Sequence, residues 1–230
     1  MKVSSIRRVG HRGAGTHEPQ NTIRSFERAI AIGVDMVETD VRRSRDGFLV
    51  LAHDEAIQGD GREMVVAEHD LEELRSLDLG HGERVATLEE ALALVRGRCG
   101  MMADLKEEGF EAQLVASIQS SGLPREQVVV PGGTDDSRAL LHRLDSSLPI
   151  SLSLDREWED RITPAFIAAI DTDAVTWQHP LITPERVTLL HERGLFVYTW
   201  TVDDLGTMRR VIAAGVDGVI TNRPELFAAV

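Results

Sequence analysis

The stretch TIRSFERAIAIGVDMVETDV, residues 22–41, decides the fold. Residues 22–32 carry apolar side chains at helical spacing, and Gly33 then offers the left-handed conformation in which helices commonly end. Residues 36–41 are largely apolar or β-branched, which is typical of a buried strand. The stretch therefore predicts a helix that is followed directly by a strand.

The same alternation recurs along almost the whole chain. Strands are expected at residues 7–10, 36–41, 101–105, 127–130, 149–153, 174–177, 195–200 and 218–221. Helices are expected at residues 22–32, 110–120, 135–144, 184–192 and 205–214. Strands that alternate with helices form parallel sheets with the helices outside. Because the number of strand–helix units approaches eight, the pattern favours a closed (β/α)8 TIM barrel over an open sheet.

One segment interrupts the alternation. The turn-forming pair Asp46-Gly47 precedes an extra strand at residues 48–51, which would return from the end of the second barrel strand. Residues 54–86 are then expected to form an irregular excursion, and the capping sequence TLEE at 87–90 precedes a helix at 91–96. We therefore expect a single domain over residues 1–230, with residues 54–86 as a small insertion after the second barrel strand.

Composition narrows the classes of function. The chain has 230 residues, of which 42% are hydrophobic, enough for one sizeable core. No stretch is long and apolar enough to span a bilayer, and the first residues, MKVSSIRRVGHRG, lack the apolar run of a signal peptide. The single cysteine, Cys99, fits a reducing compartment, so we expect a cytoplasmic protein without stable membrane insertion.

Charge restricts the partners further. The formal net charge of −13 argues against nucleic acid or an anionic membrane as the main partner. A protein of this charge that handles an anionic substrate needs a local cation. This need points towards a bound metal ion.

Two acidic residues lie on the expected strand at residues 36–41. Because side chains alternate along a strand, Glu38 and Asp40 point to one face while Val37 and Val41 point to the other. An isolated Glu-x-Asp is usually an exposed strand end, but the apolar neighbours of this one indicate a buried strand. Two carboxylates that are buried together repel each other unless a cation or a proton lies between them.

Further polar residues follow the ends of expected strands. His11 comes directly after the first strand, at the barrel end that carries active sites, and Arg12 can pair with a carboxylate or fork onto a phosphate. His53 closes the extra strand, and Asp104 and Lys106 share one face of a buried strand. Taken singly, the histidines fit solvated loop residues and the Asp-Lys pair fits a structural ion pair.

In combination, these motifs resemble the glycerophosphodiester phosphodiesterase family. The motifs have the order and approximate spacing of that family: HRG at 11–13, PQNT at 19–22, ETD at 38–40, DG at 46–47, HD at 53–54, DLK at 104–106, VYTWT at 197–201 and GVDGVIT at 215–221. The resemblance extends from His11 to Pro224. Agreement at this many spaced positions is specific.

The resemblance implies a (β/α)8 barrel, one divalent cation, and two histidines that act as general acid and base. It makes His11 and His53 the catalytic pair, and it makes Glu38, Asp40 and Asp104 the metal ligands. Oxygen ligands suit Mg²⁺ or Ca²⁺ better than zinc, and Mn²⁺ is a further candidate.

The resemblance also implies that Arg12 and Lys106 hold the phosphate. Trp200 ends a barrel strand and is expected to line the substrate cleft, with core packing as the alternative, and His179 is a further pocket candidate. The expected reaction is hydrolysis of a small glycerophosphodiester to glycerol 3-phosphate and an alcohol, by way of a cyclic phosphate or by direct attack of water.

Three features depart from the family pattern. The family usually has Glu at the positions of Asp104 and Gln20, and it often has an Arg-Thr pair shortly after the His-Asp motif. This chain has IQGDG at residues 57–61 instead, within a comparatively short excursion. In the family this excursion folds over the substrate cleft. Because the short excursion of this chain offers few contacts to the leaving group, we expect broad tolerance of the alcohol.

Two other functions compete with this one. A phospholipase D-like activity on lysophospholipids or sphingomyelin would use the same barrel, and Asp104 is compatible with it. The lack of a secretion signal and of an exposed apolar anchor disfavours that activity. A catalytically inactive binding barrel would have lost a histidine or a carboxylate, whereas this chain keeps the set apart from the Glu-to-Asp change at Asp104.

Overall fold

A closed parallel barrel forms the body of the molecule in the computed structural model, which describes residues 6–230. Its strands, in chain order, are β1 (Arg7–Gly10), β2 (Met36–Arg43), β6 (Gly100–Leu105), β7 (Val128–Pro131), β8 (Ile150–Leu154), β9 (Ala174–Gln178), β10 (Phe196–Trp200) and β11 (Gly218–Thr221). Each strand pairs in parallel with its neighbour, and β1 pairs with both β2 and β11, which closes the barrel. The predicted (β/α)8 TIM barrel is confirmed.

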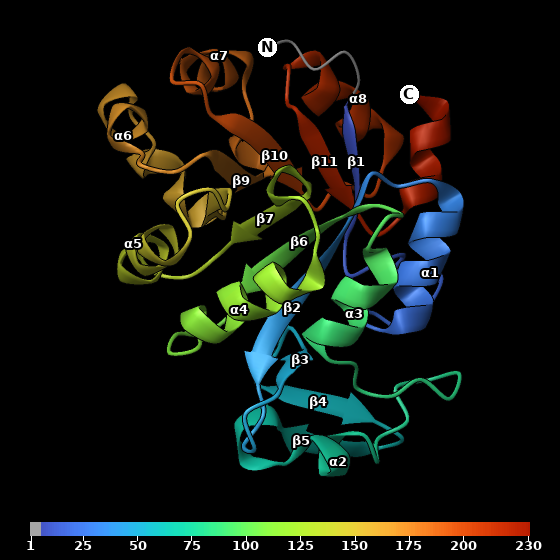
Figure 1. Ribbon diagram of the computed structural model, residues 1–230. Helices are drawn as coiled ribbons and strands as arrows, with labels where there is room; N and C mark the ends of the chain where they lie inside the picture. Colours follow the sequence, from blue (N-terminus) through green and yellow to red (C-terminus); the bar gives the residue numbers. More distant parts are fainter. Residues whose placement is uncertain (1–5) are drawn as a thin grey trace.

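A ring of helices surrounds the barrel (Figure 1). The helices are α1 (Ile23–Ile32), α3 (Leu88–Val95), α4 (Glu111–Ser121), α5 (Asp135–Leu144), α6 (Pro164–Ala169), α7 (Pro184–Glu192) and α8 (Leu205–Ala213), with a 3₁₀ helix at Pro224–Ala229 closing the chain. Most predicted elements agree with these bounds to within one or two residues. The pattern missed α6, because this helix has only six residues and Ile167 is the one among them that is buried.

Helix α1 shows how local sequence sets the element boundaries. Thr22 caps its N-terminus by accepting a hydrogen bond from the Ser25 N–H. Gly33 ends it with φ = 100°, a left-handed conformation that glycine adopts without steric cost. Phe26 and Ala29 face the barrel and are fully buried. The chain then enters β2 after a short connection, as the sequence predicts.

Side-chain alternation along β2 divides the core into two regions. Val37 and Val41 pack outwards in the hydrophobic cluster between the sheet and the helices. Met36 points into the barrel, where it joins a small apolar cluster that includes Met102 and Tyr198. Glu38 and Asp40, which lie on the same face of β2 as Met36, therefore occupy the barrel interior towards the carboxyl end of the strand. The apolar cluster therefore lies beneath Glu38 and Asp40 inside the barrel.

The insertion after β2 is more ordered than expected. Strand β3 (Leu49–Leu51) pairs antiparallel with β2, as predicted. The following segment is not an irregular excursion, because it contains an antiparallel hairpin of β4 (Ala56–Gly59) and β5 (Arg62–Val65) and a short helix, α2 (Leu71–Leu74). A separate hydrophobic cluster holds it together: Val50, Ala52, Ile57, Val66, Leu71, Leu74, Leu77 and Val85. Figure 1 shows it as a small lobe beside the carboxyl end of β2.

The chain returns from this lobe through α3. Thr87 accepts a hydrogen bond from the Glu90 N–H, and the Glu90 carboxylate accepts from the Thr87 N–H, which is the predicted capping box. The helix begins at Leu88, three residues earlier than the expected residue 91. Within residues 6–230, no helix combines the length and the apolar character that crossing a membrane requires.

Candidate active site

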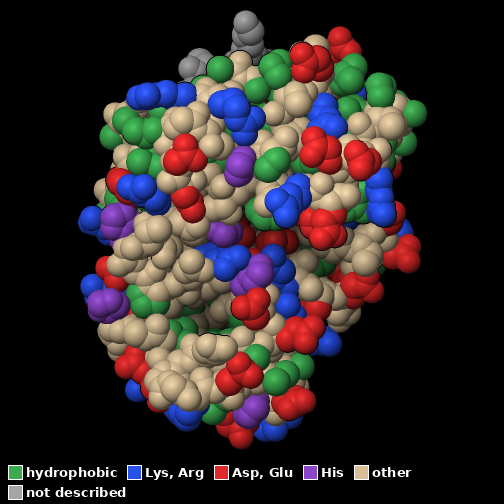
Figure 2. Space-filling view, turned by 180° about the vertical axis from the view of Figure 1, so that it is seen from behind, with side chains coloured by type: hydrophobic (Ala, Val, Ile, Leu, Met, Phe, Trp, Pro, Cys, Tyr) green, Lys and Arg blue, Asp and Glu red, His purple; other side chains and the backbone are tan. Residues whose placement is uncertain are grey.

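A pocket at the carboxyl ends of the barrel strands brings together Trp200 and all the predicted catalytic, metal-binding and phosphate-binding residues. This cavity of about 110 Å³ is lined by His11, Arg12, Glu38, Asp40, His53, Asp104, Lys106 and Trp200, together with Met102, Pro131, Ser153, Thr176 and Ile220. Figure 2, a view from behind, shows a hollow near the middle of this face in which histidine, basic and acidic side chains gather.

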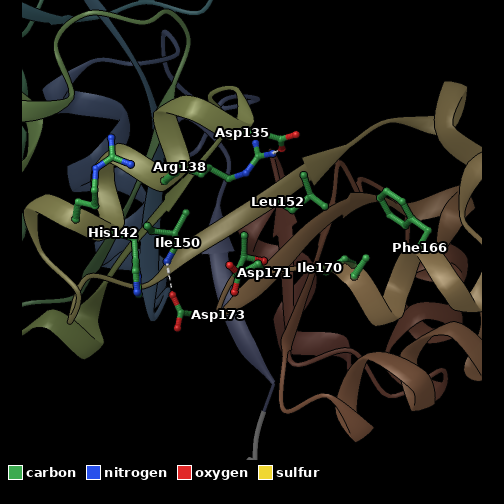
Figure 3. Close-up of a pocket in the computed structure, with 13 residues that line it drawn as sticks. Asp135, Arg138, His142, Ile150, Leu152, Phe166, Ile170, Asp171 and Asp173 are labelled. Carbon is green, nitrogen blue, oxygen red and sulfur yellow. Dashed lines mark hydrogen bonds and ion pairs between the residues drawn. The ribbon is translucent and has the colours of Figure 1, made fainter.

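A larger hollow of about 620 Å³ lies outside the barrel between α5 and α6 (Figure 3). It contains none of the predicted site residues. Arg138, on its wall, is already paired with Asp135, and Asp173 accepts a hydrogen bond from the Ile150 N–H. Chemistry rather than size therefore selects the barrel pocket as the candidate active site.

Three carboxylates converge at the centre of the barrel pocket. Glu38 and Asp40 come from β2, and Asp104 lies directly opposite Asp40 on β6. One oxygen from each carboxylate lies within 4.8 Å of the others. Burial raises the pKa of Glu38 well above its usual range, and the charges of Asp40 and Asp104 add to the shift. Burial also raises the pKa of Asp104. The cluster therefore favours any cation that can bind between its members.

Two basic side chains compensate part of this negative charge. Lys106 Nζ lies 2.9 Å from Asp40 Oδ1 and 2.6 Å from Asp104 Oδ2. Burial opposes ionisation of Asp40, but Lys106 and Arg12 outweigh burial and lower the pKa of this carboxyl group. Burial likewise opposes the charged form of Lys106, but Asp104 and Asp40 raise the pKa of its ammonium group.

Arg12 is held at the pocket by Gln20 and Asp40. Its Nη1 donates to Gln20 Oε1 at 2.8 Å, so the Gln in the PQNT motif holds this guanidinium. The Arg12 Nε lies 3.0 Å from Asp40 Oδ2 but is not aligned for a hydrogen bond, and it is buried without a partner among residues 6–230. The guanidinium therefore lies beside the Asp40 carboxylate in the pocket wall, where its charge also suits an anionic ligand.

Asn21 fixes the position of Asp40. Its Nδ2 donates to Asp40 Oδ2 at 2.9 Å, and its Oδ1 accepts from the Thr39 hydroxyl at 2.9 Å and from the Asp40 N–H at 3.3 Å. The residue is buried and adopts φ = 58°, a conformation that Asn tolerates better than most residues. The sequence motif PQNT contained Asn21, but its contact with the ETD motif required the folded chain.

His11 lies at the end of β1 in a buried position. Its Nδ1 is 2.8 Å from Asn222 Oδ1, and its Nε2 is 3.9 Å from Glu38 Oε2. Burial, reinforced by the nearby charge of Arg12, lowers the pKa of His11 to about 4. The imidazole is therefore neutral in the pocket near pH 7. The sequence interpretation assigned no role to Asn222, although it directly follows the last barrel strand.

His53 approaches the pocket from the β3 side and is more exposed than His11. Its Nδ1 lies 2.7 Å from Asp54 Oδ1. Arg42 donates two hydrogen bonds to the His53 carbonyl, at 3.1 and 2.9 Å, and also pairs with Glu107. Arg42 follows Asp40 on the inward face of β2, so the strand that carries two carboxylates also holds the backbone of His53. The sequence interpretation missed Arg42.

Trp200 forms part of the pocket wall, and its Nε1 donates to the Thr176 carbonyl at 2.9 Å. His179, the other pocket candidate, does not line this cavity. Its side chain and carbonyl instead contact Arg210 on α8.

Comparison with known proteins identifies similar chains. Residues 11–226 match the model of the glycerophosphoryl diester phosphodiesterase family. The chain is 31% identical to a glycerophosphodiester phosphodiesterase from Caldanaerobacter subterraneus subsp. tengcongensis, and the match covers 94% of each chain. A crystal structure of a glycerophosphodiester phosphodiesterase from Parabacteroides distasonis superimposes with a TM-score of 0.81 at 25% identity, covering 98% of this chain and 99% of that one.

A further solved structure carries a bound product. It is a phosphodiesterase from Oleispira antarctica in complex with sn-glycerol-3-phosphate. The TM-score is 0.82 at 21% identity, and the match covers 96% of this chain and 94% of that one. At this identity the likeness concerns the fold.

Asn21→Gly tests the support of the buried carboxylate. Glycine keeps the positive φ at little cost, so the variant removes the side-chain hydrogen bonds without adding backbone strain. Because one lost bond goes to a buried charged group, we expect the free energy of unfolding to fall by about 2 kcal/mol or more in urea denaturation.

Asp60→Gly is the matched control, because Asp60 also has a positive φ but lies exposed in the β4–β5 turn. Its exposed ion pair with Arg62 contributes little, so a change within about 1 kcal/mol is expected. Equal losses in the two variants would mean that Asn21 does not support Asp40.

Proposed function

This chain belongs to the glycerophosphoryl diester phosphodiesterase family and is a phosphoric diester hydrolase, and from this premise we propose how its pocket works. The pocket hydrolyses glycerophosphodiesters to glycerol 3-phosphate and an alcohol, with one divalent cation and with His11 and His53 as the acid–base pair. The observation that carries the proposal is the convergence of three carboxylates, two imidazoles and two basic side chains in one small cavity.

The carboxylate cluster fits a hard divalent cation. Glu38, Asp40 and Asp104 offer oxygen ligands, which suit Mg²⁺ or Ca²⁺, and Mn²⁺ is a further candidate. Burial raises the pKa values of Glu38 and Asp104, and the charges of neighbouring carboxylates add to the shifts, so a cation between these groups would favour their ionised forms. A bound cation would offset negative charge on a nonbridging phosphate oxygen.

The protein's own side chains orient the phosphate and move protons. Arg12 and Lys106 line the cavity, and their cationic groups can donate to phosphate oxygens. His11 and His53 each use Nδ1 in a hydrogen bond, which leaves Nε2 of both rings available to the substrate. One imidazole removes a proton from the nucleophile, which is water in direct hydrolysis or a glycerol hydroxyl on the cyclic-phosphate route, while the other protonates the leaving oxygen as the P–O bond breaks. On the second route, water then opens the cyclic phosphate to give glycerol 3-phosphate.

The insertion, which lies wholly within the described residues, provides no lining side chain that could recognise the leaving alcohol. Within residues 6–230, the segment 54–86 contributes no side chain to the pocket, although His53 immediately precedes it. The segment instead packs on its own hydrophobic cluster, and Gly80 lies close to Pro19. Discrimination requires contacts that differ between substrates. The structure is therefore consistent with broad tolerance of the leaving alcohol.

Removal of divalent metal is expected to abolish hydrolysis, and Mg²⁺ or Ca²⁺ should restore it. Asp104→Asn keeps the side-chain shape but removes a ligand charge, so its cation affinity in titration calorimetry should fall sharply, whereas Asp104→Glu should bind and stay active. Asp171→Asn is the control, because Asp171 is exposed in the hollow outside the barrel. Full turnover in demonstrably metal-free protein would contradict the cation requirement.

His11→Ala and His53→Ala should each lose about 10²–10⁴-fold in kcat, the usual contribution of a general acid or base. Both residues lie at strand ends, so circular dichroism should show folded protein. His191→Ala is the control, because this histidine lies on α7 and pairs with Asp217 away from the pocket. Near-parental turnover in either pocket variant would remove that histidine from the mechanism.

Substrate range is tested by comparing kcat/KM for the glycerophosphodiesters of choline, ethanolamine, inositol and glycerol at saturating metal. We expect values within about 100-fold of one another, because one absent apolar contact seldom changes the ratio further. A larger preference for one alcohol would show that residues beyond the cavity contact the leaving group.

A further inference from the structure

We propose that Asp203 and Asn222 are positioning residues that fix the tautomer of His11, with the proton on Nδ1 and the lone pair of Nε2 directed into the pocket. The proposal rests on the proposed function, since it concerns how one member of the histidine pair is prepared for catalysis. The three residues follow adjacent barrel strands: Asp203 comes after β10, Asn222 after β11 and His11 after β1.

Asp203 determines which way the Asn222 amide points. An ionised carboxylate can only accept hydrogen bonds. Asp203 Oδ1 accepts from the Thr221 hydroxyl at 2.9 Å and from the Asn222 backbone N–H at 2.8 Å. Asp203 Oδ2 accepts from Asn222 Nδ2 at 2.8 Å. With Nδ2 engaged by the carboxylate, Oδ1 is the atom of the amide that faces His11.

The orientation of Asn222 in turn determines the proton position on His11. An amide oxygen has no hydrogen, so the 2.8 Å contact between Asn222 Oδ1 and His11 Nδ1 requires a proton on Nδ1. In the neutral ring the lone pair then belongs to Nε2. Nε2 is the nitrogen on the Glu38 side, 3.9 Å from Glu38 Oε2, inside the pocket.

The backbone holds this chain of contacts rigidly. The Asn222 carbonyl accepts from the Thr16 N–H at 3.3 Å and from the Thr16 hydroxyl at 2.9 Å. The His11 N–H donates to the Thr221 carbonyl at 2.8 Å. A β-carbon on Gly15 would lie 2.9 Å from Asn222 Oδ1, so the loop leaves little space for another amide position. Backbone hydrogen bonds therefore hold both His11 and Asn222, the two partners of the positioning contact.

Asp203→Asn is the most direct test. The substitution would place an amide nitrogen at position 203 where Asp203 Oδ2 now accepts from Asn222 Nδ2. Because two donors cannot form a hydrogen bond with each other, the Asn222 amide should rotate. Asn222 Nδ2 then faces His11 Nδ1. The His11 ring can accept this hydrogen bond only if Nδ1 carries no proton, which places the proton of the neutral ring on Nε2. We expect ¹⁵N NMR of histidine-labelled protein to show the His11 tautomer exchanged, and kcat to fall by about 10²-fold or more because Nε2, the nitrogen inside the pocket, then carries a proton in place of its lone pair.

The double variant Asp203→Asn/Asn222→Asp provides the rescue. Here the new Asn at 203 accepts through Oδ1 and donates through Nδ2, and the new Asp at 222 accepts from both this amide and His11 Nδ1. Every hydrogen bond has a donor and an acceptor again, so the parental tautomer and most of the lost turnover should return. Asn222→Asp alone sets two carboxylates against each other and should remain impaired.

Asp204→Asn is the control, since this neighbouring residue caps α8 and Asn caps helices as well as Asp does. Its turnover and the His11 NMR signals should be unchanged. Retention of the parental tautomer in Asp203→Asn, or no recovery in the double variant, would overturn the inference. Failure of the parental chain to hydrolyse glycerophosphodiesters would instead refute the proposed function, and the NMR signals would still decide whether Asp203 and Asn222 set the tautomer.

Discussion

The burial of Glu38 and Asp40 beside the partly buried Asp104 is the constraint on which the rest of the structure depends. Removing even one carboxylate from water costs on the order of several kcal/mol unless charges and hydrogen bonds compensate. Glu38 accepts from the Arg12 N–H at 2.9 Å, and Asp40 contacts Asn21, Arg12 and Lys106. The HRG, PQNT, ETD and DLK motifs therefore form one network, and each supplies part of the compensation for the others.

Much of this arrangement could be predicted from the sequence because it depends on local periodicity. Alternation along a strand places Glu38 and Asp40 on one face, and the parallel register of β2 with β6 sets Asp104 opposite Asp40. Strand ends in a barrel meet at one face, so His11 was expected near the carboxylates. The insertion was harder to predict, because its strands are short and partly exposed and its hydrophobic cluster uses residues that are scattered over the segment.

What the sequence interpretation missed depends on contacts between distant segments. His11 and Asn222 are 211 positions apart and meet only because β1 pairs with β11. Neither Asp203 nor Asn222 belongs to a spacing pattern that indicates a role, and an Asp or Asn after a strand is common in loops. Arg42 was overlooked for a related reason. Its partner, the His53 carbonyl, is a backbone atom, and no side-chain pattern marks it.

These two classes of contact correspond to two parts of the pocket. The carboxylates and His53 come from or directly follow β2, β3 and β6, which are neighbours in the sheet. The environment of His11 requires β1, which is the first strand of the chain, and β10 and β11, which are the last two. His11 therefore acquires its hydrogen-bond partner only when the barrel closes. In this molecule, pairing of β1 with β11 both closes the barrel and brings His11 to its hydrogen-bond partner Asn222.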